Sequence, residues 1–406
     1  MKMRMVWPAI AIAGGIGCGP ALAADVKVTP IIDARLRYEH VDQDGIDREA
    51  DAVTARVRAG AEASAGDWAV LAEAEGTLAI DEDYNSGVNG RTAYPLVADP
   101  QNVEINRLQL QYRGLKGLTA TLGRQSINLA DQRFVGGVAW RQNEQTYDAA
   151  RVEWAITPKL KADMTYSWSV RTIWGVDGAG ARQQAISGDN VFAMLGWKTP
   201  VGTLSGFAFL IDQDEAAVSG FGLSSQTYGG RLQGARPLGS KVKLDYALSY
   251  ARQSGWHRNP NDYAADYWLA DAGLTMAGWR IGGGYEVLGA DGGAALTSFQ
   301  TPLATAHKFQ GWADKFLTTP PNGVRDLYAS VGKSWAGLAG ADAVSVQAIY
   351  HRFDSDRQDQ HYGNEIDLQA TARFGRITLL AKYADYDAKA FMTDTRKAWL
   401  SIEWVY

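Results

Sequence analysis

The chain has 406 residues and a formal net charge of −5, which argues against a nucleic-acid binder that relies on a basic surface. Its single cysteine excludes an internal disulfide framework and a metal site made of several thiolates. Glycine is abundant at 44 residues, proline is sparse at 12, and tryptophan and tyrosine number 14 and 18. This composition suits curved strands with aromatic girdles and does not suit a helical protein.

Residues 1–23 are predicted to be a cleaved secretory signal peptide. The start is basic, an apolar stretch follows it, and residues 21–23 are Ala-Leu-Ala, a small-x-small cleavage site. A lipoprotein site at Cys18 is the alternative, and either reading implies export. The mature domain is then residues 24–406, which contain no run of about 18 apolar residues and hence no predicted transmembrane helix.

Polar and apolar side chains alternate along most of the mature chain, as they do in strands that have one apolar face. In one such strand, Met164, Trp168 and Val170 fall on the apolar face. A less regular stretch puts Phe207 and Phe209 on the inner, polar face. The clearest strands are predicted at residues 32–39, 53–62, 68–75, 107–113, 160–171, 241–250 and 365–374.

The chain ends in one more strand of this kind. Leu400 and Ile402 share an apolar face that finishes in the aromatic residue Tyr406, whereas Trp399 is an exception on the polar face. An apolar face with an aromatic carboxyl-terminal residue is typical of the closing strand of a bacterial outer-membrane barrel.

The connections between the predicted strands alternate between short and long, as in outer-membrane barrels. With both termini on the short-turn rim the strand number is even, and nine long loops predict 18 strands, with 16 as the alternative. We therefore expect long extracellular loops and short periplasmic turns. The long loops are predicted at about 41–50, 81–101, 127–146, 172–189, 212–225, 254–264, 290–323, 354–363 and 386–395.

A soluble all-β protein would also show alternation. Two features argue against it: one face carries charges of both signs while the other is aliphatic, small and aromatic, and the aromatic residues of that second face cluster near strand ends. We predict a transmembrane antiparallel β-barrel that is closed by pairing of the last strand with the first. Closure is needed because lipid offers no hydrogen-bond partners to the backbone groups of an exposed strand edge. The expected girdle residues are Tyr38, Trp68, Tyr112, Trp154, Trp168, Trp197 and Tyr350.

The predicted inner face carries many charged side chains. One interpretation is a hydrated wall of mutually paired charges, and it is the better interpretation for any individual residue. The other is a row of arginines that guides an anionic solute, since guanidinium groups bind carboxylates in a bidentate manner, and it fits the set as a whole. The arginines that we place on this face and along a solute pathway include Arg56, Arg58, Arg107, Arg124 and Arg151.

Catalytic patterns are weak in this chain. The five histidines are scattered without metal-ligand spacing, and neither a G-x-S-x-G nucleophile elbow nor a P-loop is found. We predict no enzyme, no metal site and no cofactor.

Two long-loop regions are distinctive. Residues 122–154 are LGRQSINLADQRFVGGVAWRQNEQTYDAARVEW, and residues 307–332 are HKFQGWADKFLTTPPNGVRDLYASVG. Both resemble the alginate-export family of outer-membrane β-barrels, and in particular its porin-like relatives. The resemblance implies a monomeric barrel of about 18 strands with an electropositive, arginine-lined lumen that inward elements partly close.

The resemblance also implies site residues. Arg124 matches the G-R-Q arginine at a strand end and is expected to face the lumen; Arg133, Arg141 and Arg151 follow in the same block. Asp131 and Glu144 are expected to pair with these guanidinium groups. In the second block we expect a loop folded over or into the pore, its aromatic side chains packed against the wall. The pore-loop residues are His307, Trp312, Asp314, Lys315 and Phe316.

The predicted function is a passive outer-membrane channel for small anionic or sugar-derived solutes, or for an exported anionic polysaccharide such as alginate. A barrel hydrolase and a non-conducting structural or adhesion barrel are the alternatives. Expected partners are outer-membrane lipid, the solute, and the barrel-assembly machinery, which would recognise the strand ending at Tyr406. Near balance of acidic and basic inner-face residues argues against alginate itself, and the direction of transport is open.

Overall fold

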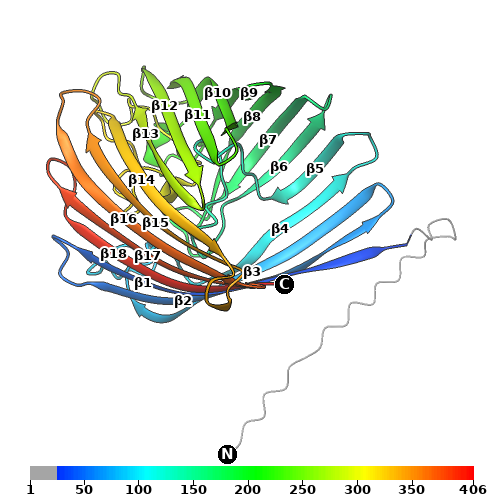
Figure 1. Ribbon diagram of the computed structural model, residues 1–406, viewed down its shortest axis with the longest axis horizontal. Helices are drawn as coiled ribbons and strands as arrows, with labels where there is room; N and C mark the ends of the chain where they lie inside the picture. Colours follow the sequence, from blue (N-terminus) through cyan, green and yellow to red (C-terminus); the bar gives the residue numbers. More distant parts are fainter. Residues whose placement is uncertain (1–24) are drawn as a thin grey trace, which may run out of the picture.

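The computed structural model describes residues 25–406, so the predicted signal peptide and Cys18 lie outside the described residues. Across this part of the chain, 18 antiparallel strands form one closed sheet (Figure 1). The strands are β1 (Lys27–Gln43), β2 (Ala50–Ala65), β3 (Trp68–Asp83), β4 (Asn102–Tyr112), β5 (Leu118–Gln125), β6 (Thr146–Ala155), β7 (Leu160–Arg171), β8 (Ala185–Thr199), β9 (Gly202–Ile211), β10 (Ser225–Leu238), β11 (Val242–Gly255), β12 (Ala264–Met276), β13 (Trp279–Leu288), β14 (Val324–Ala336), β15 (Ala343–Asp354), β16 (His361–Phe374), β17 (Ile377–Ala388) and β18 (Thr395–Val405).

The barrel closes where β18 pairs with β1, with Leu36 opposite Ile402 and Tyr38 opposite Leu400. Closure is required in lipid, because each unpaired backbone group there costs several kcal/mol. The predicted count of 18 strands is confirmed, as is the alternation of long loops and short turns. Between these strands, residues 25–406 also contain three short 3-10 helices: η1 (Ser219–Phe221), η2 (Ala306–Lys308) and η3 (Leu338–Gly340).

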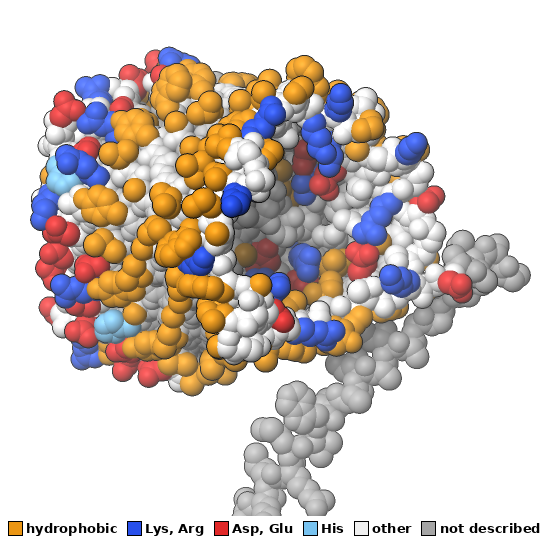
Figure 2. Space-filling model, viewed as in Figure 1, with side chains coloured by type: hydrophobic (Ala, Val, Ile, Leu, Met, Phe, Trp, Pro, Cys, Tyr) orange, Lys and Arg blue, Asp and Glu red, His pale blue; other side chains and the backbone are white. Residues whose placement is uncertain are grey.

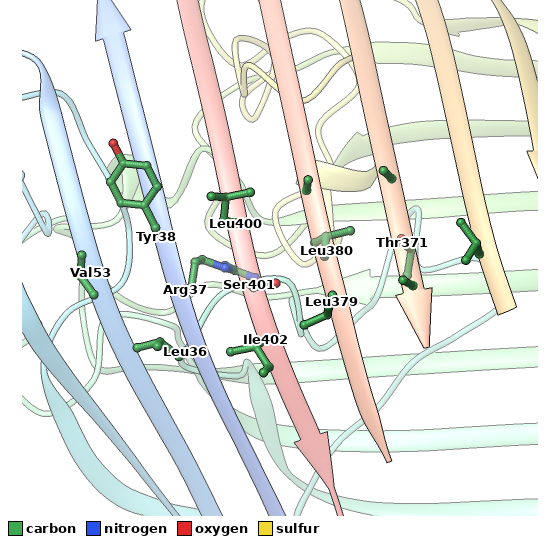
Figure 3. Close-up of a pocket in the computed structure, with 14 residues that line it drawn as sticks. Leu36, Arg37, Tyr38, Val53, Thr371, Leu379, Leu380, Leu400, Ser401 and Ile402 are labelled. Atoms are coloured by element: carbon green, nitrogen blue, oxygen red, sulfur yellow. The ribbon is translucent and has the colours of Figure 1, made fainter. Parts of the chain in front are cut away.

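The outer wall is apolar, and Figure 2 shows hydrophobic side chains spread over it while charged side chains lie in the hollow. At the closing seam Leu36, Leu400 and Ile402 are exposed on this wall and line a shallow groove of about 520 Å³ (Figure 3). This apolar groove faces the hydrocarbon and is not a solute site. The girdle tryptophans Trp68 and Trp197 are also exposed there, as predicted. Within residues 25–406, no helix is long and apolar enough to cross a membrane.

Val170 and Trp399 are examples of side chains that depart from simple alternation. Val170 was expected on the lipid face but is buried at 3% exposure, because a β-bulge between Ser167 and Ser169 shifts the facing of β7 by one residue. Trp399, the exception in the last strand, is fully buried inside the barrel. The molecule's packed core is therefore in the lumen, where loops meet the inner face of the wall.

Candidate functional site

Two long loops cross the lumen, and we call them together the septum: residues 126–145, between β5 and β6, and residues 289–323, between β13 and β14. They are joined to each other by backbone contacts. Val135 and Leu303 form an isolated parallel bridge, the Gly136 amide donates to the Leu303 carbonyl at 2.9 Å, and the Thr305 amide donates to the Gln132 carbonyl at 3.1 Å. The septum is thus one composite element, as the resemblance implied for the second loop.

Arg133 ties both loops to the wall. Its Nε donates to Oε1 of Glu286 on β13 at 2.7 Å, its Nη2 donates to Oε1 of Gln310 at 2.9 Å, and its Nη1 donates to Oγ1 of Thr301 at 3.2 Å. The guanidinium also lies 4.7 Å from the ring centroid of Phe309, within cation–π range. All three nitrogens of this buried guanidinium group therefore donate hydrogen bonds, and these bonds attach both septum loops to the barrel wall. We call Arg133 the anchor of the septum.

Arg141 attaches the septum to another part of the wall, six strands away from β13. Its Nη1 donates to Oε2 of Glu39 on β1 at 3.0 Å, and its Nη2 donates to Oδ2 of Asp314 at 3.2 Å. Arg35 on β1 donates to the backbone carbonyls of Ala139 and Trp140 at 3.0 and 2.9 Å. Charge-assisted hydrogen bonds of this kind are about twice as strong as neutral ones, so this contact is well defined.

Apolar contacts complete the attachment. Phe134 packs against Phe207 and Phe209 with ring centroids 5.3 and 5.8 Å apart, which explains why those two phenylalanines face inward. Phe316 packs on Phe353 of the wall at 4.5 Å. Gly311, at φ +76°, lies so close to β16 that a Cβ there would meet the Glu365 carboxylate at 2.3 Å.

The septum separates two cavities. The inner cavity, about 610 Å³, opens toward the short-turn rim and is lined by wall residues such as Thr378 and Glu403. The outer cavity, about 480 Å³, lies under the long loops, with Gln43 and Met392 in its lining. His307 lines both cavities and therefore stands at the boundary between them.

Both cavities carry more basic than acidic side chains. Among the described residues that line the inner cavity, the one carboxylate is Glu403. Among those that line the outer cavity, it is Asp314. The basic residues are Arg35, Arg37, Lys308 and Lys382 in the inner cavity and Arg141, Lys315 and Lys397 in the outer one.

A hydrogen-bonded chain crosses the boundary. Lys382 Nζ on β17 lies 2.9 Å from His307 Nε2, and His307 Nδ1 lies 2.7 Å from Asp314 Oδ1. Burial, together with the positive charge of Lys382, holds the pKa of His307 well below its usual value. A neutral imidazole with its proton on Nδ1 satisfies both contacts: Lys382 donates to Nε2, and Nδ1 donates to Asp314.

Lys382 is also surrounded by indole rings. Its Nζ lies 3.6 Å from the ring centroid of Trp312, 4.1 Å from that of Trp140 and 5.4 Å from that of Trp399. Three rings around one ammonium group make a cation–π cage. The cage fixes the ammonium at the inner face of the boundary.

The pH dependence of the septum follows from His307. When the septum opens and the imidazole is hydrated, its pKa returns toward 6.5. Below that pH the open state gains a proton that the closed state does not bind, so acidification favours opening, by up to about tenfold for each pH unit. Burial raises the pKa of Asp314, but Lys397, His307 and Arg141 outweigh it and hold that pKa well below its usual value. Asp314 therefore adds no pH dependence between pH 5 and 7.5.

Amide hydrogen exchange of residues 304–316, corrected for intrinsic rates, checks this prediction at pH 7.5 and pH 5. Lys315, whose pKa burial lowers to about 8, is mostly protonated throughout this range. The His307→Gln variant should lose the dependence. If that variant opens on acidification as the wild type does, another group is responsible.

The predicted arginines of the wall are mostly paired with carboxylates. Arg56 contacts Glu403 at 2.9 Å as well as Asp33, and Arg58 contacts Glu144 at 3.3 Å as well as Glu75. On neighbouring strands, Arg107 pairs with Glu73 at 2.7 Å and Arg151 with Asp163 at 2.5 Å. The paired-wall interpretation therefore describes these four. At the cavities Arg35, Arg37, Arg141 and Lys397 are paired as well, whereas Lys308, Lys315 and Lys382 form no ion pair with another described residue.

The prediction that Arg124 faces the lumen is wrong. Arg124 stands opposite Leu108 on β4 and Asp148 on β6, and Leu108 and Leu122 are exposed on the outer wall. It forms a bidentate pair with Asp148 at 2.8 and 3.0 Å. Side chains two residues apart share a face, so Arg124 follows Leu122 outward; it lies next to the last residue of β5, toward the long-loop rim, with its charge paired.

The expected partners of the loop arginines are also corrected. Asp131 pairs with Arg231 of β10 at 2.9 Å, and Glu144 pairs with Arg58, instead of with Arg133, Arg141 or Arg151. Asp131 and Glu144 bind the septum to the wall, because a buried loop carboxylate is stabilised by a cation from the facing strand.

Several residues at the boundary were not predicted from the sequence. Lys382 and Lys397 lie on inner faces of β17 and β18 that also carry apolar residues. The alternation of polar and apolar residues therefore did not identify these two lysines as candidate site residues. The one available signal was Trp399, whose position on a polar face marks a place where the lumen is packed.

Comparisons with known proteins agree with this architecture. The family model described as alginate export matches residues 28–405. A search of curated proteins finds no match. Among solved structures, Acinetobacter baumannii OccAB4 is 12% identical with a TM-score of 0.70, and covers 95% of this chain and 98% of that chain. Pseudomonas aeruginosa OccK5 (OpdH) is 12% identical with a TM-score of 0.66, and covers 93% and 97%. P. aeruginosa OpdK, solved with vanillate, is 11% identical with a TM-score of 0.68, and covers 93% and 98%. At these identities the likeness shows the fold.

Proposed function

The chain belongs to the alginate export family, a family of outer-membrane channels, and from this premise we propose that it conducts small carboxylate-bearing solutes, such as sugar acids, by passive diffusion. The observation that supports the proposal is the excess of basic over acidic side chains among the residues that line the two cavities, on either side of the septum. A cation-rich, water-filled site selects anions.

Cavity size favours a small solute over a polymer. Volumes of about 610 and 480 Å³ fall in the range of sites that hold one small molecule. A polysaccharide chain would have to thread the boundary at His307, where Trp140 stacks on the imidazole at 4.4 Å. Alginate export would therefore require displacement of the whole septum, whereas a small solute requires only a local opening.

The remaining parts of the proposal concern the chain outside its channel role. We propose that residues 1–23 are removed on export, that the mature barrel of residues 24–406 is monomeric, and that the assembly machinery recognises the strand ending at Tyr406. We also propose that the protein is not an enzyme. The charges at the boundary serve solute passage in this view, with Lys382 and His307 as binding groups.

Planar-bilayer recordings test the function. The purified barrel should pass more chloride than potassium under a salt gradient, and glucuronate should reduce the chloride current where glucose at the same concentration does not. Vanillate, with which the OpdK barrel was solved, is a second carboxylate probe. A barrel that folds and inserts but carries no current would instead support the structural or adhesion role, and a cation preference would refute the proposed solute class.

A further inference from the structure

Asp314 is the carboxylate on which three basic side chains converge. Lys397 Nζ of β18 donates to Oδ2 at 2.7 Å, Arg141 Nη2 donates to the same oxygen at 3.2 Å, and His307 Nδ1 donates to Oδ1 at 2.7 Å. The four side chains are each 6–7% exposed. A carboxylate that accepts from three donors on different elements occupies a complete anion site.

This site belongs to the outer cavity. Asp314 supplies the one carboxylate among the described residues that line that cavity, and Arg141, Lys315 and Lys397 supply three cations. If Asp314 moved away, Lys397 would lose its carboxylate and Arg141 would keep only its contacts on the wall side, with Glu39 at 3.0 Å, so the cavity would carry an unmatched positive charge. Buried cations in that state demand an anion, so the cavity would then bind one from solution.

The segment that carries Asp314 is held in a strained conformation. Asp314 has φ +62° and Gln310 has φ +49°, both in the left-handed region that non-glycine residues rarely adopt, and Gly311 between them has φ +76°. Such conformations persist only when surrounding contacts impose them. The loop is therefore drawn into the site by the three donors and would relax if another anion took its place.

We propose that Asp314 is a tethered stand-in for the solute: a carboxylate-bearing solute in the outer cavity displaces it from Lys397, Arg141 and His307, and its release opens the septum. The inference rests on the proposed function and deepens it, because it names the site that the solute's carboxylate occupies. His307 loses its Nδ1 acceptor when Asp314 leaves, so the hydrogen-bonded chain to Lys382 is broken at the same moment. The solute then passes to the basic residues of the inner cavity.

The displacement model predicts stronger solute binding when the competitor is removed. A tethered carboxylate acts at a high effective concentration, so a free solute must compete with it. In Asp314→Asn the charge is gone while the side-chain shape is kept. We expect the dissociation constant for glucuronate to fall at least about tenfold in this variant, and the chloride conductance to rise.

The experiment measures glucuronate binding by calorimetry in detergent, with glucose as the neutral probe, alongside bilayer conductance. Asp359→Asn is the matched control: Asp359 is also a loop aspartate with positive φ (+50°) and an arginine partner, Arg325 at 2.7 Å, but its side chain is 87% exposed. This control should bind glucuronate as the wild type does. Adding Lys397→Gln to Asp314→Asn should abolish the gain.

Unchanged or weaker glucuronate binding in Asp314→Asn, in a wild-type background that conducts anions, would overturn the displacement model and leave the proposed function intact. A wild-type barrel that neither conducts nor binds glucuronate would remove both. Should Asp314→Asn fail to fold, hydrogen exchange on the wild type decides: saturating glucuronate should deprotect residues 311–316 and glucose should not, and unchanged protection would refute the model.

Discussion

The Arg133→Ala variant is expected to lose about 3–5 kcal/mol of folding free energy and to conduct more current than the wild type, because it leaves the buried Glu286 without its cation. The side chains of Arg133 and Glu286 are 2% and 4% exposed, so water does not replace the lost partner. Tyr267 and Gln310 still donate to Glu286, which limits the loss. Chemical unfolding in detergent and single-channel conductance measure the two effects.

A matched control separates this anchor from arginine pairs in general. Arg252 pairs with Asp266 at 3.1 Å, but the two side chains are 57% and 38% exposed, so Arg252→Ala should cost at most about 1 kcal/mol and leave the current unchanged. The double variant Arg133→Ala with Glu286→Gln also removes the unpaired buried carboxylate. It should recover stability but still conduct more current than the wild type. If Arg133→Ala alone keeps wild-type stability and current, the septum does not depend on this pair.

Alternation was sufficient to predict the barrel, because one period of two residues governs every strand and lipid forbids an open edge. It also contained the correct position of Arg124, which has the parity of Leu122, but we assigned Arg124 to the inner face with the other charged residues and the G-R-Q match to the family led to the same assignment. The alternation of polar and apolar residues does not predict β-bulges. The bulge in β7 turns Val170 inward, and nothing in the alternation of β7 marks it.

The sequence was sufficient to predict which loop enters the pore, but not which residues of the septum and the wall contact each other. The long loops that contain Arg133 and His307 were distinctive enough to predict an inward element. Their partners were not predictable, because Arg133 and Glu286 are separated by 153 residues and only the closed barrel brings them together. Counting inner-face charges likewise suggested a balance, whereas the fold pairs most of the arginines and, among the described residues, leaves Lys308, Lys315 and Lys382 at the cavities without an ion pair.

Removing the second septum loop, residues 289–323, should change transport more than the Arg133→Ala substitution does. The loop can be cut at its base, because Gly323 lies against β13: a Cβ on it would be 2.6 Å from the Leu288 carbonyl and 3.2 Å from the Ala290 amide. A linker of about three glycine and serine residues therefore spans the gap left by residues 292–322. All 18 strands and their pairings remain, so the shortened chain should still insert as a barrel.

Without residues 292–322, Arg133 loses Thr301 and Gln310, and Arg141 loses Asp314, so the remaining loop is released from one side of the lumen. The two cavities should then merge, with conductance rising several-fold and the discrimination between glucuronate and glucose largely lost. The same linker in place of residues 47–49, an exposed part of the loop between β1 and β2, is the control and should change neither. Because the boundary at His307 is the closure that the septum provides, an excised barrel that conducts no better than the wild type would show that another part of the chain closes the lumen.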